Sequence, residues 1–105
     1  MYEYKAKILK IIDGDTVDFI VDLGFHVNIK VRGRFLHVNT PEKGSPDWRK
    51  ATEECRSLLH SVAEIKGDEM WVIIKTQKTG KYGRWLVEID GVTDRLAEVW
   101  PYGDK

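Results

Sequence analysis

The chain has 105 residues, which allows one domain with a modest core and leaves too little for a second, so we treat residues 1–105 as a single domain. Apolar residues make up 42% and charged residues 32%, as in soluble globular proteins, and no apolar run approaches the ~20 residues of a membrane span. We therefore expect no membrane association. The formal net charge is zero, so overall charge gives no support for nucleic-acid binding.

The first residues carry interspersed lysines and no long apolar segment, so no signal peptide is evident. Cys55 is the only cysteine, which excludes an intrachain disulfide and a cysteine-rich zinc site. These features predict a monomeric protein of the cytoplasm.

The first third of the chain has the pattern of three strands. Residues 2–12 are rich in Ile, Leu and Tyr and end at the turn dipeptide Asp13-Gly14. Residues 16–23 resume as a strand, and residues 27–35 alternate apolar and polar side chains. We predict a three-stranded antiparallel meander.

A helix is predicted next. Ser45 offers a capping hydroxyl, Pro46 suits the first helical position and Asp47 complements the helix dipole. Apolar residues then recur at helical spacing, and Gly67 provides the stop: Trp48, Ala51, Cys55, Leu58, Leu59 and Val62. The prediction is one amphipathic helix of roughly five turns.

Two strands and a short helix complete the predicted order. Residues 70–75 and 84–89 have the composition of strands, and residues 93–100 could form a closing helix. We therefore predict a mainly β fold with helix. Its five strands, with one long helix between the third and the fourth, fit the oligonucleotide-binding (OB-fold) barrel.

Four aspartates lie close together at the first turn, at positions 13, 15, 18 and 22. An EF-hand calcium loop would need glycine at its sixth position and glutamate at its twelfth, where this chain has Asp18 and Gly24. That hypothesis fails. The alternative is that one aspartate joins oxygen ligands from elsewhere in the fold to bind a hard cation, as phosphodiester chemistry often requires.

Partners for such an aspartate are present in two later segments. Residues 34–42 offer a guanidinium, an amide oxygen and a carboxylate, and residues 81–84 (KYGR) add another arginine. Three motifs follow one another along the chain: DGDTV at 13–17, Arg34 with NTPE at 39–42, and KYGR at 81–84. In this order they resemble the motifs of the staphylococcal nuclease (thermonuclease) family. The resemblance covers nearly the whole chain. It implies an OB-fold barrel and divalent-cation-dependent hydrolysis of DNA or RNA, leaving 3′-phosphate and 5′-hydroxyl ends.

The resemblance also implies roles for individual residues. Arg34 and Arg84 match the two arginines that bind the phosphate, and Glu42 matches the general base. Lys81 and Tyr82 match positions that border the substrate phosphate. Tyr102 lies where the family places aromatic residues near the nucleotide base.

For the cation, most plausibly calcium by the same resemblance, Asp15 matches the first ligating aspartate and Thr40 a carbonyl ligand. Asn39 departs from the pattern, because the family has aspartate there as the second ligand. An amide oxygen can still bind a hard cation but brings one less negative charge, so weaker calcium binding or another metal preference is expected.

Other interpretations stay open. Asn39 and the neutral net charge favour a catalytically weak or inactive OB-fold module that binds nucleic acid or another protein. Asp13 is predicted to shape the turn, and Asp18 and Asp22 to be solvent-facing strand residues. Trp48, on the apolar face of the predicted helix, is assigned to the core.

Overall fold

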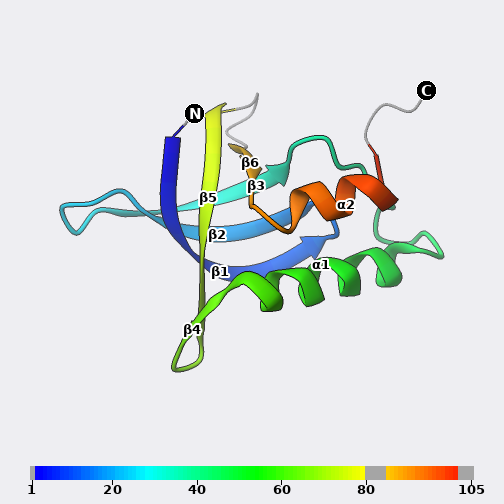
Figure 1. Ribbon diagram of the computed structural model, residues 1–105, viewed down its shortest axis with the longest axis horizontal. Coiled ribbons are helices and arrows are strands. Elements are labelled where there is room, and N and C mark those ends of the chain that lie inside the picture. Colours follow the sequence, from blue (N-terminus) through cyan, green and yellow to red (C-terminus); the bar gives the residue numbers. More distant parts are fainter. Residues whose placement is uncertain (1, 80–84, 102–105) are drawn as a thin grey trace.

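The computed structural model describes residues 2–79 and 85–101, which form six strands and two helices (Figure 1). In chain order these are β1 (Tyr2–Asp13), β2 (Thr16–Asp22), β3 (Asn28–Phe35), α1 (Trp48–Val62), β4 (Glu64–Lys66), β5 (Glu69–Thr79), β6 (Trp85–Glu88) and α2 (Thr93–Val99). The prediction of a mainly β fold with a long helix after the third strand and a short helix near the end is confirmed.

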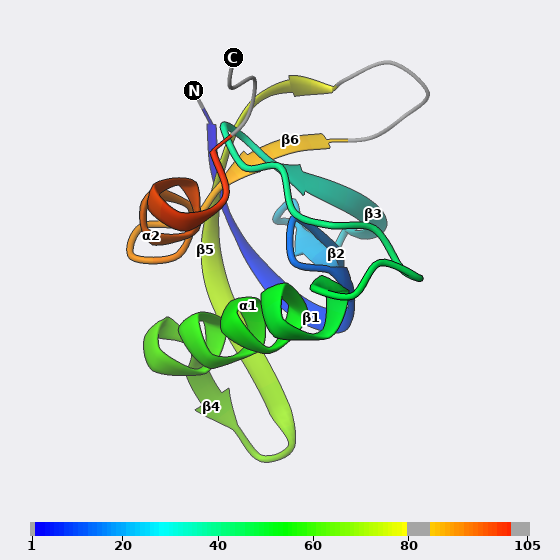
Figure 2. The same cartoon turned by 90° about the vertical axis from the view of Figure 1, so that its right-hand side faces the viewer.

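The strands belong to one sheet that partly closes into a ring. β1, β2 and β3 form the predicted antiparallel meander, and β6 pairs parallel to β3 and antiparallel to β5. β5 in turn pairs antiparallel with the first half of β1, which brings the two sides of the sheet together (Figure 2). The first strand therefore belongs to both sides of the ring.

The core lies inside this ring and beneath the helices. Alternate residues of β3 point inward, as the sequence pattern predicts, and Phe19 of β2 and Phe35 of β3 are fully buried. Cys55 and Leu59 from α1 and Leu96 from α2 complete it. The packing interpretation of Cys55 agrees with its complete burial.

The predicted helix boundaries and strand count are wrong in three places. α1 begins at Trp48, because the preceding residues form a turn in which the Trp48 N–H donates to the Ser45 carbonyl (3.2 Å). It ends at Val62, and Gly67, with φ of 64°, serves the turn between β4 and β5. The short strand β4 makes six strands in the described residues where five were predicted.

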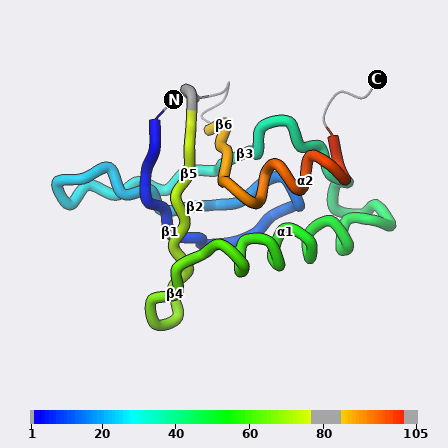
Figure 3. Tube along the Cα trace, viewed as in Figure 1, coloured from blue at the N-terminus to red at the C-terminus, as the bar shows by residue number. Residues whose placement is uncertain are grey.

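The helices lie next to each other against the sheet (Figure 3). α1 packs against β1 and β5. The indole Nε1 of Trp100, just after α2, donates to Glu54 Oε1 of α1 (3.0 Å). The carbonyl of Trp100 accepts from the Asn39 N–H (2.9 Å), which fixes the segment after β3 against the chain after α2. Among the described residues, no helix is long and apolar enough to cross a membrane.

Candidate active site at the turn between β1 and β2

Asp15 lies in the tight turn that joins β1 to β2, next to Gly14. A Cβ atom on Gly14 would stand 2.8 Å from Cγ2 of Thr40 and 2.9 Å from the carbonyl oxygen of Ala51. The turn therefore packs directly on α1 and on the segment after β3, and glycine is required for this close approach. Asp15 is held in a fixed, buried position as a result.

Three groups surround the Asp15 carboxylate. Oδ1 accepts from the hydroxyl of Thr16 (3.0 Å), and Oδ2 accepts from the backbone N–H of Thr40 (3.3 Å). Oδ2 also lies 3.4 Å from Nη2 of Arg34. The structure thus brings together Asp15, Arg34 and Thr40, which the sequence analysis had selected from two separate segments.

Arg34 links this carboxylate to the segment after β3. Its Nη2 donates to Oδ1 of Asn39 (3.5 Å), and its Nη1 donates to the Val38 carbonyl (3.2 Å). Backbone pairing places the arginine here, since Arg34 stands opposite Thr16 in the ladder between β2 and β3. The side chains of Asp15 and Asn39 therefore converge on one positively charged group.

The oxygen atoms around this guanidinium suit a hard cation. They comprise the Asp15 carboxylate and the Asn39 amide oxygen. Thr40 adjoins them through its backbone N–H, which donates to Asp15 Oδ2, and its hydroxyl is buried without a hydrogen-bond partner among the described residues. Within the same residues no three His, Cys, Asp or Glu side chains are grouped so that they could bind a metal ion. A cation here would thus depend on amide, hydroxyl or carbonyl oxygens in addition to Asp15.

Glu42, the predicted general base, follows Asn39 and Thr40 in the chain, and its side chain is exposed. It lines a cavity of about 410 Å³ together with Asp13 and Trp48. The remaining predicted site residues fall outside the described part of the chain: Lys81, Tyr82, Arg84 and Tyr102.

Asp13 accepts a 2.6 Å hydrogen bond from the indole Nε1 of Trp48, so this aspartate has a structural partner as well as a place at the turn. Trp48 is half-buried at the start of α1, so its assignment to the core was wrong. Sequence reasoning missed this pair because the two residues are far apart in the chain and no local pattern connects them.

Asp18 is buried, which corrects the expectation of a solvent-facing residue. Arg32, opposite it on β3, donates Nε–H to Oδ1 (2.9 Å) and Nη2–H to Oδ2 (3.3 Å). The hydrogen bond from Arg32 lowers the pKa of the Asp18 carboxyl against the opposing effect of burial. The Gly24 N–H donates a hydrogen bond to Asp22 Oδ1 (2.8 Å), so Asp22 shapes the turn between β2 and β3.

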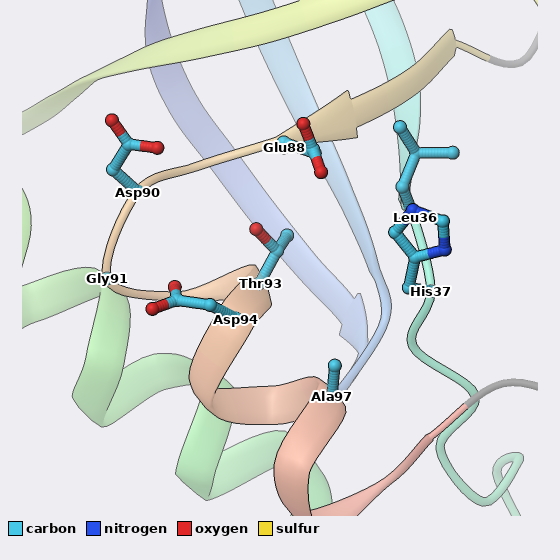
Figure 4. A pocket seen from close by; sticks show the side chains of 8 residues that line it. All are labelled: Leu36, His37, Glu88, Asp90, Gly91, Thr93, Asp94 and Ala97. Carbon is cyan, nitrogen blue, oxygen red and sulfur yellow. The ribbon is translucent and has the colours of Figure 1, made fainter.

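A second cavity, of about 460 Å³, has a different chemistry (Figure 4). Its walls come from the segment after β3, from the end of β6 with the loop that follows it, and from α2. Three carboxylates, of Glu88, Asp90 and Asp94, line it with the single imidazole of His37. A polyanionic substrate would be repelled there, so the turn between β1 and β2 is the better candidate for phosphate chemistry.

The chain was compared with protein-family models and with curated proteins, and neither comparison found a match.

Proposed function

We propose that this protein is a divalent-cation-dependent nuclease of the staphylococcal nuclease type that hydrolyses phosphodiester bonds in DNA, RNA or both, leaving 3′-phosphate and 5′-hydroxyl ends. The observation that carries the proposal is the convergence of Asp15 and Asn39 on the Arg34 guanidinium, at 3.4 Å and 3.5 Å. Carboxylate, amide and guanidinium groups meet there, and the exposed carboxylate of Glu42 follows shortly after Asn39 and Thr40 in the chain. Such a reaction requires this set of groups.

The oxygens of Asp15 and Asn39, with those of Thr40, would hold the cation, which by the family resemblance is calcium. When bound, the cation would supply Lewis-acid stabilisation of the charge that develops on the phosphate. Arg34 would donate paired hydrogen bonds to the phosphate oxygens, in exchange for its contact with Asn39.

Glu42 would accept the proton of the attacking water, and its exposure makes it accessible to that water. Arg84 would complete the clamp on the phosphate, Lys81 and Tyr82 would border it, and Tyr102 would contact the base, all by the family resemblance.

The proposal extends to the finer description of the fold. A five-stranded OB-fold barrel would use the ring of β1, β2, β3, β6 and β5, with β4 as an addition to β5. The partial closure of the ring and the position of α1 between β3 and the later strands support this assignment.

A second candidate is a module of the same fold that binds nucleic acid or a protein without cleaving it. Two observations favour it: an amide replaces a carboxylate at Asn39, and Arg34 is already engaged by Asp15, Asn39 and the Val38 carbonyl. Such a domain would need neither the cation nor the general base.

A cleavage assay separates the two candidates. End-labelled single-stranded DNA and RNA are incubated with the protein in calcium, in magnesium or in chelator. We expect cleavage only with a divalent cation, and a loss of about a hundredfold or more for Glu42→Gln, as for removal of a general base. Glu64→Gln is the matched control, because Glu64 is an exposed glutamate on β4.

Equal cleavage by wild type and Glu42→Gln would refute the proposed mechanism. Absence of cation-dependent cleavage, together with retained binding of the strand, would establish the non-catalytic module instead.

A further inference from the structure

The cavity beside Glu42 has features that neither the cation site nor the proposed reaction uses. Its volume of about 410 Å³ lies within the range of pockets that bind small ligands. The end of β1 contributes apolar side chains through Ile11 and Ile12, and the start of α1 contributes the indole of Trp48. It combines apolar walls with an aromatic ring, which suits the flat face of a nucleobase.

Trp48 is fixed in orientation before any ligand arrives. Its Nε1 donates to Asp13 Oδ1 at 2.6 Å, which holds the indole plane relative to the turn that carries Asp15. The same bond engages an oxygen of the Asp13 carboxylate within the cavity. An aromatic platform that is already ordered loses little conformational entropy when a base stacks on it.

Two lysines balance the carboxylates of Asp13 and Glu42 at this cavity. Lys10 and Lys43 both line it and are exposed, and neither forms an ion pair among the described residues. Lys43 Nζ lies over one face of the Trp48 ring, 6.0 Å from its centroid, so a stacking base would displace this ammonium group or use the opposite face. An aromatic surface with flexible ammonium groups beside it is the combination by which proteins bind single-stranded nucleic acid.

The cavity adjoins the candidate active site along the chain. Asp13, the last residue of β1, precedes the turn that carries Asp15, and Glu42 follows closely after Asn39 and Thr40 while lining the cavity. We propose that this cavity is a second nucleotide subsite, in which a base next to the scissile phosphate stacks on Trp48 while Lys10 and Lys43 contact the phosphate of that nucleotide.

This inference rests on the proposed nuclease function. It adds a substrate class, an unpaired strand of at least two nucleotides, because a base must leave the duplex stack to reach the face of an indole.

The subsite is tested by measuring how tightly the protein binds oligonucleotides in the presence of a chelator, which prevents cation-dependent cleavage. Fluorescence anisotropy would follow labelled single-stranded DNA and RNA octanucleotides, and competition would measure a 5′-phosphorylated mononucleotide. The matched pair is Trp48→Phe and Trp48→Leu: both remove the bond to Asp13, and only phenylalanine keeps an aromatic face. Thermal unfolding of both variants checks that they lose similar stability.

For Trp48→Leu we expect octanucleotide affinity to fall roughly five- to a hundredfold, while Trp48→Phe keeps most of it. Mononucleotide affinity should be the same in both variants. In the double variant Lys10→Ala, Lys43→Ala, the affinity for the octanucleotide should depend less steeply on salt concentration. The decrease in slope should correspond to the loss of about one phosphate contact.

Equal octanucleotide affinity in the Phe and Leu variants would overturn the subsite, since stacking would then contribute nothing. Cleavage of nucleic acid by wild type alongside that result would leave the proposed function intact. If wild type neither binds nor cleaves DNA or RNA, the proposed function itself is wrong, and the subsite fails with it.

Discussion

Replacing Asn39 by aspartate tests whether this position binds the cation. Asn39 Oδ1 lies 3.5 Å from the Arg34 nitrogen that also contacts Asp15 Oδ2 at 3.4 Å. Asn39→Asp would put a second carboxylate at this point with almost no change in size. A cation that takes its ligands from both side chains would then face two negative charges where the wild type offers one.

The expected gain follows from the geometry. A divalent cation and a unit negative charge about 4 Å apart interact by about 8 kcal/mol at an effective dielectric constant of ~20, twice the energy of two unit charges. Against this act the repulsion of the new carboxylate by Asp15, its loss of hydration, and competition from Arg34, which pairs with the same oxygens in the absence of cation. We expect a net gain of about 1.5–3 kcal/mol, which is calcium binding roughly ten- to a hundredfold tighter.

Isothermal titration of calcium into wild type and variant measures this difference. The matched control is Asn28→Asp, which adds the same charge at the exposed first residue of β3. A dissociation constant that is unchanged in Asn39→Asp, or lowered equally in the control, would refute the assignment of Asn39 as a ligand.

Three further predictions concern stability and reactivity. Gly33→Ala should lower the free energy of unfolding by about 1–3 kcal/mol, because the new Cβ would stand 2.8 Å from the buried ring of Phe19; an unchanged urea midpoint would contradict this. Asp18→Asn should lower the free energy of unfolding by about 1 kcal/mol near neutral pH, a modest loss because Arg32 is exposed. Because the pKa of the Asp18 carboxyl is lowered in the folded protein, the difference in stability from wild type should vanish as pH falls from the ordinary pKa of 3.8 through the lowered one. A difference in urea stability that persists at the lowest pH would argue against the pair. Burial raises the pKa of the Cys55 thiol to about 12, so iodoacetamide at pH 8 should modify it far faster in urea than in the native protein, and similar rates would show that the thiol is accessible.

The strands of the meander could be predicted because local pattern determines them. The alternation from Ile29 to Phe35 has one face that must be buried, and the turn at Asp13-Gly14 sets where the first ladder starts. The short strand β4 could not be predicted, because its three residues are all exposed and are too few to establish a strand pattern. The start of α1 was misplaced because a turn closed by the Ser45 carbonyl competes with the helix.

For the candidate site, the sequence selected Asp15, Arg34, Asn39 and Thr40, and the structure brings these four residues together. Asp15 and Arg34 meet because β2 and β3 pair with Arg34 opposite Thr16, the residue after Asp15. The bond between Asp13 and Trp48 depends on how α1 packs against the turn, and nothing within either segment specifies it. Contacts between distant segments therefore marked the limit of the sequence prediction.

The double pairing of β1 has a consequence for the order of folding. The ladders of β1 with β2 and of β2 with β3 join neighbouring segments, whereas β1 meets β5 only after most of the chain has been brought back to it. Because closing long loops costs entropy before any contact compensates for it, we expect the meander to form early and the seam between β1 and β5 to form late. In stopped-flow experiments, Val31→Ala should therefore slow folding, while Ile74→Val should chiefly accelerate unfolding. The reverse assignment of rates would show that the seam forms first.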